Sequence, residues 1–169
     1  QFKRVMVPLA VEVLEEDGNP YPGSIEVGAL LKNKGVQVVD TLESLAALKK
    51  GIVIIRSHGV SRDTETKMRE LGMRVIDMTC PFVKKIHKLV QEYSEKGYYV
   101  VIIGSGDHPE VQGIVGWSDE TRTSVISTVD EAQNLDLKPW KKVCIVAQTT
   151  FNYNKFQELI EIIQKKGYD

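Results

Sequence analysis

The chain has 169 residues, and its 22 basic and 23 acidic side chains leave a formal net charge of −1. This balance excludes a protein that binds nucleic acid through a basic surplus, because such binding needs Lys and Arg to neutralise phosphates. Hydrophobic residues make up 42% of the chain and charged residues 27%, which excludes a disordered composition and is typical of a globular protein.

The lengths of the apolar runs and the number of cysteines exclude further classes of protein. The longest apolar runs, such as residues 98–103, have the length of a β-strand, so we expect no membrane-spanning segment. We expect no secretory signal, since no basic segment followed by an apolar one opens the chain. The two cysteines are too few for a disulfide framework, and a reducing, cytoplasmic setting is expected.

Short runs of β-branched residues alternate with helical patterns along the chain. In chain order, we predict helices at 3–16 and 26–34, strands at 36–39 and 52–55, a helix at 61–71, a strand at 75–77, a helix at 82–96, strands at 99–103, 123–126 and 143–147, and a helix at 151–166. The helical patterns after residue 60 stop at Gly72, Gly97 and Gly167. This alternation predicts an α/β fold with parallel sheets and right-handed crossovers.

The same pattern predicts two domains. A break near Cys80 and Pro81 separates a first small parallel-sheet α/β domain, residues 1–80, from a second, residues 81–169. Polar segments follow four of the predicted strands directly, at residues 56–60, 78–81, 104–110 and 148–150. They contain His58, Cys80, His108, Glu110, Gln148 and Thr149. Because ligands of open α/β sheets bind at the carboxyl ends of strands, we expect these residues to form a site.

The segments that follow the strands also lead into helices. Free backbone N–H groups and the positive end of the helix dipole favour an anion there. Thr149, Thr150 and the turn at 104–106 are therefore candidate anion ligands, and phosphate or diphosphate is the natural guess. Neither a Walker A loop nor a G-x-G-x-x-G motif is present, so nucleotide binding by those routes is unsupported.

Each of these polar residues also has a purely structural interpretation. His58 precedes Gly59 and can stabilise a turn, and His108 with Pro109 can begin a helix. Either threonine of the 148–150 segment can cap a helix. Cys80 can be a buried small hydrophobe. The joint placement at strand ends favours the functional interpretation over these separate ones.

Other candidate residues are expected to be structural. Cys144 lies among apolar residues inside a predicted strand, so we expect it in the core. His87 is expected on the helix surface, and Lys84, Lys85 and Lys88 on a solvated helix face.

The chemistry of the set leaves three options open. A thiolate at Cys80 would be a nucleophile or a soft metal ligand. One thiolate with two histidines could hold zinc or iron, and a histidine near a carboxylate could deliver a proton. Spacing alone does not choose among them.

Four motifs occur in order along the chain. They are Ser57-His58-Gly59-Val60-Ser61, Asp77-Met78-Thr79-Cys80-Pro81, His108-Pro109-Glu110-Val111-x-Gly113 and Gln148-Thr149-Thr150. Together they resemble the 4-hydroxy-3-methylbut-2-enyl diphosphate reductases of the LytB/IspH family, and the resemblance is specific between about residues 51 and 152.

The resemblance implies an iron–sulfur enzyme of the non-mevalonate isoprenoid pathway. Such an enzyme reductively removes the hydroxyl of its diphosphate substrate and gives isopentenyl and dimethylallyl diphosphate. Its three similar α/β domains surround a [4Fe–4S] cluster held by three cysteines, with one iron open to substrate. Ferredoxin or flavodoxin would supply electrons, and neither a nucleic acid nor a membrane is implied as a partner.

Motif matching assigns roles to individual residues. Cys80 would be a cluster ligand, and Glu110 would relay a proton to the departing hydroxyl. His58 and His108 would contact the diphosphate. Thr149 would lie near the substrate hydroxyl and orient the Glu110 network, with support from Gln148.

Three parts of the family pattern are missing from the chain. The segment with the first cluster cysteine would precede Phe2, residues 21–24 lack the family's His-Asn pair, and the third domain would follow Asp169. We therefore expect a two-domain fragment that retains a cluster poorly and has negligible turnover alone. The alternatives are a non-catalytic anion- or diphosphate-binding module of the same fold, and an enzyme with Cys80 as nucleophile.

Overall fold

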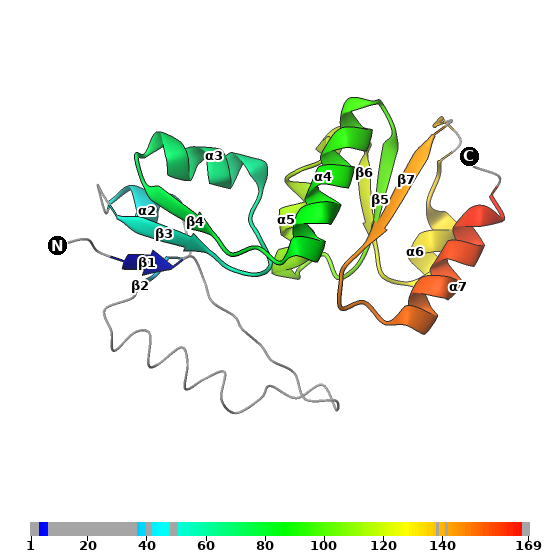
Figure 1. Cartoon of the computed structure of the whole chain (residues 1–169). Coiled ribbons are helices and arrows are strands. Elements are labelled where there is room, and N and C mark those ends of the chain that lie inside the picture. The colour runs from blue at the N-terminus through cyan, green and yellow to red at the C-terminus, as the bar shows by residue number, and fades with distance from the viewer. Residues whose placement is uncertain are drawn as a thin grey trace. The chain divides into compact units, whose positions relative to one another are not determined.

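The computed structural model describes residues 4–6, 37–39, 42–47, 51–137, 139–140 and 142–166. The chain divides into two compact units, one of residues 1–59 with 63–80 and the other of residues 60–62 with 81–169. Each unit is an α/β structure with a parallel sheet, so the predicted fold class is confirmed (Figure 1). Within the described part of the chain, no helix combines the length and the apolar character needed to cross a bilayer.

In the described residues, the first unit has a four-stranded parallel sheet. Its elements are β1 (Arg4–Met6), β2 (Gln37–Val38), α2 (Leu42–Ala46), β3 (Ile52–Ile55), α3 (Arg62–Glu70) and β4 (Arg74–Asp77). The strands lie in the order β2-β1-β3-β4, and Ile52 of β3 is in register with Arg74 of β4. Strand β3 consists of β-branched residues and buries Val53 and Ile55, as a central parallel strand does. Gly72 has φ = +70°, so α3 stops there as predicted.

The predicted helix at 3–16 is wrong at its start, because residues 4–6 form strand β1. This strand pairs with β2 on one side and β3 on the other, with Val5 in register with Gln37 and Val53. Pairing on both sides outweighs a local helical pattern, and Pro8 disfavours helical backbone at the residue before it. The rest of that prediction and the predicted helix at 26–34 lie outside the described residues.

The second unit has a three-stranded parallel sheet in the described residues, ordered β6-β5-β7. Its elements are α4 (Pro81–Glu95), β5 (Tyr99–Ile103), α5 (Pro109–Val115), a 3₁₀ turn η1 (Glu120–Arg122), β6 (Thr123–Ile126), α6 (Val129–Asn134), β7 (Val143–Ala147) and α7 (Tyr153–Gln164). The strands predicted at 99–103, 123–126 and 143–147 are confirmed at both ends.

Two hydrophobic layers sandwich the central strand β5. Val101 and Ile103 pack into one cluster with residues of α6 and α7. Val100 and Ile102 pack into the other with residues of α4 and α5. This alternation is the period of two that places successive side chains on opposite faces of a sheet. The helices therefore cover both faces, with α4 and α5 on one side and α6 and α7 on the other (Figure 1).

The expectation that His87 lies on the surface is wrong. Its side chain is only 5% exposed and stacks on Trp117 with ring centroids 5.4 Å apart. The buried face of α4 runs through Val83, His87, Val90 and Ser94, spaced by four, three and four residues. Residues with this spacing share one face of a helix, and His87 falls on it.

Residues 60–62 belong to the second unit because they pack on the end of α5. The indole Nε1 of Trp117 donates to the carbonyl of Val60 at 2.8 Å, and the amide of Arg62 donates to the carbonyl of Gly116 at 3.2 Å. A Cβ on Gly116 would lie 2.2 Å from Cβ of Ser61, so only glycine allows this close approach.

Candidate functional site

In the first unit, the loops after β3 and β4 are joined through their backbones. The amide of Cys80 donates to the carbonyl of Ser57 at 2.8 Å, and the amide of Met78 donates to the carbonyl of Ile55 at 3.0 Å. Cys80 thus lies against the loop that carries His58, at the carboxyl edge of the sheet. Both side chains are partly exposed, and α4 follows Cys80 directly in the chain.

A side-chain turn precedes Cys80 and fixes the direction of the backbone. Oδ1 of Asp77 accepts hydrogen bonds from the amide of Thr79, at 2.9 Å, and from its hydroxyl. Thr79 is buried, and this turn delivers the next residue, Cys80, to the sheet edge. Sequence reasoning missed this contribution, although an Asp two residues before a Thr at a strand end is the signal for such a turn.

His58 lies in a tight turn. The amide of Gly59 donates to the carbonyl of Arg56 at 3.0 Å, and Gly59 has φ = +72°, a left-handed conformation that favours glycine. The structural interpretation of the His58-Gly59 pair is therefore correct for the glycine. It does not account for the imidazole of His58, which is partly exposed.

In the second unit, Glu110 and Thr149 form a doubly hydrogen-bonded pair. Oε1 of Glu110 accepts from the Thr149 amide at 2.7 Å, and Oε2 accepts from the Thr149 hydroxyl at 2.8 Å. The Glu110 side chain is 1% exposed, whereas Thr149 is exposed. Glu110 comes from the first turn of α5 and Thr149 from the loop after β7. The pair therefore joins a buried carboxylate to the protein surface.

His108 caps the helix that carries Glu110. Its Nδ1 accepts a hydrogen bond from the Glu110 amide at 3.1 Å, and Pro109 occupies the first turn as predicted for a helix start. Because Nδ1 is an acceptor, the neutral ring carries its proton on Nε2. The His108 imidazole is thereby oriented with Nε2 on the side away from the helix backbone.

Gln148 clamps the loop after β5 to the loop after β7. Its Oε1 accepts from the Ser105 amide at 3.2 Å, and its Nε2 donates to the Thr150 hydroxyl at 2.9 Å. Gln148 is 9% exposed, so both ends of its amide are satisfied within the protein. Gln148 therefore holds these two loops together.

Gly104 permits the close packing beneath this clamp. A Cβ at Gly104 would lie 2.7 Å from Cγ2 of Val111 and 3.0 Å from Cβ of Gln148. A real Cβ does not fit at these distances, so the residue must be glycine for α5 and the two loops to meet. Gly106, two residues along the same loop, differs in this respect, because a Cβ there would meet nothing within 4 Å.

The alternative in which Thr149 or Thr150 caps the following helix is wrong. The N-cap of α7 is Asn152, whose side chain accepts from the Lys155 amide at 3.0 Å. The Thr149 hydroxyl is instead committed to Glu110, and the Thr150 hydroxyl accepts from Gln148. The backbone amides of Ser105 and Thr149, expected as anion donors, are engaged by these same side chains.

The donor atoms of this chain do not by themselves fit a [4Fe–4S] cluster, which is held mainly by cysteine thiolates. Among the described residues, no three His, Cys, Asp or Glu side chains are grouped to hold a metal. The sequence has two cysteines, and Cys144 lies in β7 of the other unit, where burial raises the pKa of its thiol. Cys80 can supply one thiolate, and the remaining ligands would have to come from elsewhere.

Comparison with known proteins gives one consistent family. A LytB protein family profile matches residues 24–169. The 4-hydroxy-3-methylbut-2-enyl diphosphate reductase of Caldanaerobacter subterraneus subsp. tengcongensis is 40% identical over 137 residues, which cover 81% of this chain and 46% of that protein. The reductase of the same name from Clostridioides difficile is 34% identical over 173 residues, covering 97% of this chain and 60% of that protein. The chain thus spans about half the length of the curated relatives it matches.

The fold is also found in solved structures. The structure of E-1-hydroxy-2-methyl-but-2-enyl-4-diphosphate reductase from Plasmodium falciparum aligns with a TM-score of 0.81 at 22% identity, covering 98% of this chain and 48% of that one. A second structure, of (E)-4-hydroxy-3-methyl-but-2-enyl diphosphate reductase, aligns with a TM-score of 0.74 at 33% identity and covers 98% of this chain and 54% of that one.

Proposed function

This chain belongs to the LytB protein family, and from that membership we propose that it is part of a 4-hydroxy-3-methylbut-2-enyl diphosphate reductase. The reaction would remove the hydroxyl of the substrate by reduction in the non-mevalonate pathway and give isopentenyl and dimethylallyl diphosphate. The observation that carries the proposal is the buried Glu110 carboxylate, paired with the exposed Thr149 and lying beside the oriented His108.

Glu110 is the proposed proton donor. Its carboxyl is shielded from water, and each oxygen faces a donor on Thr149. When the carboxyl holds a proton on Oε2, the Thr149 hydroxyl can accept it and donate its own proton outward, because a hydroxyl is both donor and acceptor. A departing hydroxyl placed at Thr149 would receive a proton in this way and leave as water.

The histidines are the proposed contacts for the diphosphate. Because Nδ1 of His108 accepts from the Glu110 amide, Nε2 carries the ring proton and can donate a hydrogen bond to a phosphate oxygen. His58 is likewise proposed as a diphosphate contact, and the carbonyl of its neighbour Ser57 accepts a hydrogen bond from the Cys80 amide. Thr149 would also touch the substrate, while Gln148 would position the loop that carries it.

A [4Fe–4S] cluster of the kind that the resemblance implies would supply the electrons and the Lewis acidity of the proposed reaction. In this chain Cys80 is the proposed ligand, and the other thiolates would come from outside the 169 residues. The proposed electron donor is ferredoxin or flavodoxin, and the proposed location is the cytoplasm.

A non-catalytic diphosphate-binding module remains the second candidate. It is favoured by one observation: in the described residues the two cysteines lie in different units, and no three potential metal-ligating side chains are grouped. The two candidates differ in whether the residues of this chain can support reduction once the remaining ligands are supplied.

A chimera tests the proposal directly. The stretch of the Clostridioides difficile relative that matches this chain would be replaced by this chain, and the product would be tested for growth rescue of a strain that lacks the reductase. We expect the chimera to rescue growth. Cys80→Ser should abolish both iron binding and rescue, whereas Lys85→Ala, on the exposed face of α4, should rescue fully. A folded chimera that binds iron and the diphosphate substrate without turnover would favour the binding module and overturn the proposal.

A further inference from the structure

A short segment, residues 60–62, carries the chain from the turn that contains His58 into α3, and we call it the anchor segment. It follows the His58-Gly59 pair directly, and α3 begins at its last residue, Arg62. These three residues belong to the second unit, although the residues before and after them belong to the first. The second unit therefore holds the chain two positions after His58, a proposed diphosphate contact.

Two hydrogen bonds and a steric fit hold the anchor segment. The indole Nε1 of Trp117 donates to the carbonyl of Val60 at 2.8 Å, and the amide of Arg62 donates to the carbonyl of Gly116 at 3.2 Å. A Cβ on Gly116 would lie 2.2 Å from Cβ and 2.9 Å from Cα of Ser61, so the segment packs directly on this glycine. Trp117 supplies the side-chain donor among these contacts.

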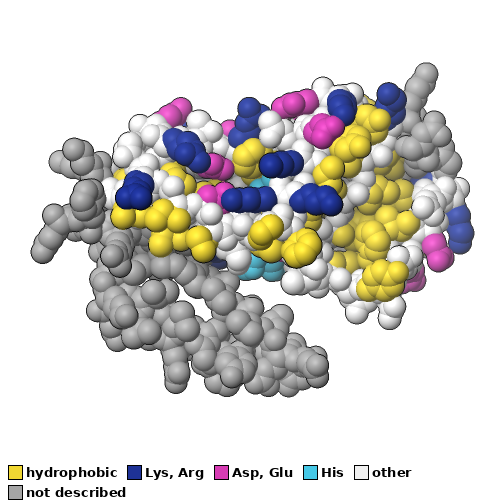
Figure 2. Space-filling view, viewed as in Figure 1, with side chains coloured by type: hydrophobic (Ala, Val, Ile, Leu, Met, Phe, Trp, Pro, Cys, Tyr) yellow, Lys and Arg dark blue, Asp and Glu magenta, His cyan; other side chains and the backbone are white. Residues whose placement is uncertain are grey.

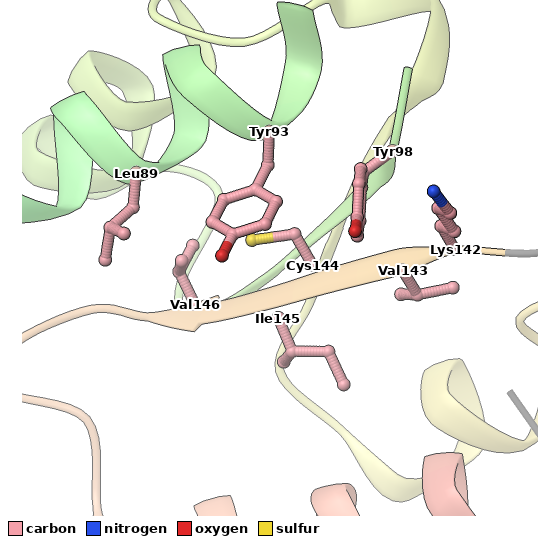
Figure 3. Close-up of a pocket in the computed structure, with 8 residues that line it drawn as sticks. All are labelled: Leu89, Tyr93, Tyr98, Lys142, Val143, Cys144, Ile145 and Val146. Carbon is pink, nitrogen blue, oxygen red and sulfur yellow. The ribbon is translucent and has the colours of Figure 1, made fainter. Parts of the chain in front are cut away.

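Helix α4 carries different side chains in three directions. Lys85 and Lys88 are exposed, and Figure 2 shows Lys and Arg side chains gathered over this helix. Leu89 and Tyr93 point toward β7 and line the open groove beside that strand (Figure 3). His87 points in the third direction, toward the residues that follow α5.

The stack on His87 fixes the plane of the Trp117 ring. The two ring centroids are 5.4 Å apart and the ring planes differ by 17°, and the His87 side chain is only 5% exposed. The indole N–H lies in the plane of its ring, so a fixed plane also fixes the direction in which Nε1 donates to Val60. The backbone of Trp117 is held as well, because its amide donates to the carbonyl of Ile114 at 3.0 Å.

We propose that Trp117 is a positioning residue for His58. Gly59 lies between His58 and the anchor segment with φ = +72°, and glycine restrains the backbone less than any other residue. The turn therefore depends on a restraint at Val60, which the indole N–H supplies. A turn that is already ordered loses less conformational entropy when a ligand binds, so the imidazole of His58 is pre-organised for the diphosphate. This inference rests on the proposed function of His58.

Steady-state kinetics of the chimera with the Clostridioides difficile relative test the proposal. Trp117→Phe keeps an aromatic ring against His87 but removes the N–H donor. We expect the KM for the diphosphate substrate to rise about three- to tenfold while kcat stays within about twofold, because binding is weakened and the reacting groups are not. Gly116→Ala, which forces a methyl group against Ser61, should raise the KM at least as much. The control is Trp140→Phe, which changes the other tryptophan of the chain and should leave both constants unchanged.

A double-mutant cycle with His58→Ala tests whether Trp117 acts through His58. In that background Trp117→Phe should change the KM by less than about twofold, because the residue that it positions is absent. An undiminished effect of Trp117→Phe would overturn the proposal. It would also be overturned if His58→Ala raised the KM and Trp117→Phe did not. If the chimera binds the substrate without turnover, the dissociation constant replaces the KM in the same cycle.

Hydrogen exchange on the 169-residue chain measures the restraint without activity. The amide of Gly59 donates to the carbonyl of Arg56 at 3.0 Å. It should exchange about three- to tenfold faster in Trp117→Phe, while the amides of β3 stay protected as an internal reference. Equal exchange in the variant and the parent would overturn the proposal. A KM unchanged by His58→Ala alone would count against the proposed function of His58, and exchange at Gly59 would then decide whether Trp117 restrains the turn.

Discussion

Glu110 and Thr149 lie 39 positions apart in the chain, yet both carboxylate oxygens of Glu110 accept hydrogen bonds from Thr149. The contact exists because β5 and β7 are neighbouring parallel strands, with Ile103 in register with Ala147, so the loops after them start side by side. Gln148 then holds the two loops together through Ser105. The edge of the sheet thus brings Glu110 and Thr149 together from segments that are distant in sequence.

Replacing Thr149 by valine tests how much this pair contributes to the stability of the second unit. Valine keeps the backbone donor but removes the hydroxyl, so the buried Glu110 carboxylate loses one of its two hydrogen bonds. We expect the free energy of unfolding of the second unit to fall by about 1–3 kcal/mol, measured by urea denaturation. Thr149→Ser keeps the hydroxyl and should stay close to the parent. Equal stability of the valine and serine variants would show that the hydroxyl bond carries no weight.

A pair of glycine substitutions tests the packing beneath the site. Gly104→Ala would push a methyl group against Val111 and Gln148, at distances of 2.7 and 3.0 Å. Overpacking of this kind costs about 1–3 kcal/mol of stability, which a urea midpoint measures. Gly106→Ala is the matched control in the same loop, because nothing lies within 4 Å of the added carbon. If both variants were equally stable, the close approach at Gly104 would not constrain the loop.

The hydrogen bonds at the start of α6 predict how the stability of the protein changes with pH. The Ser127 amide donates to Oε2 of Glu131 at 2.7 Å, and this bond, with others from Ser127 and Thr128, holds the pKa of Glu131 below its ordinary value. A lowered pKa in the folded state stabilises the protein above the unfolded pKa, about 4.3, and this contribution disappears as pH falls through the folded pKa. The Tm difference between the parent and Glu131→Gln should therefore be largest near pH 7 and shrink toward pH 3. A difference that grows on acidification would contradict the assignment.

Much of the sheet was predictable because its strands are runs of β-branched residues that end at polar loops. That pattern also predicted the polar segments that follow the strands at 52–55, 99–103 and 143–147. Strand β1 was not predictable, since Arg4–Met6 is extended only through pairing with two strands distant in sequence. The prediction that His87 lies on the surface failed for a related reason. Which face of a helix is buried depends on what packs against it, and Trp117 stacks on His87.

The candidate site was likewise predictable only in part. Strand ends identified His108, Glu110 and Thr149, but the hydrogen bonds among them depend on loop geometry that no local pattern encodes. The cap of α7 illustrates this point. Thr149, Thr150 and Asn152 are all good capping residues by type, and only the tertiary bond to Glu110 removes Thr149 from that role.

The cysteine content predicts the outcome of anaerobic iron–sulfide reconstitution of the 169-residue chain. Because Cys80 and Cys144 are the only two cysteines of the sequence and burial raises the pKa of the Cys144 thiol, we expect no stable, near-stoichiometric cluster. Iron and sulfide analysis with a visible spectrum measures this, and Cys80→Ser is the parallel sample. Stoichiometric iron and sulfide that disappear with Cys80→Ser would show that the chain completes the site by itself or shares it between copies.

The most direct test of the account is the single-turnover rate of the chimera with the Clostridioides difficile relative, comparing the parent with Glu110→Gln. Glutamine keeps the size of the side chain but cannot donate the carboxylic proton, so product formation should slow about 10²- to 10⁴-fold while iron content and substrate binding stay unchanged. Glu110→Asp should retain part of the rate. A Glu110→Gln chimera that forms product within about twofold of the parent rate, with full iron content, would contradict the assignment of Glu110 as the proton donor.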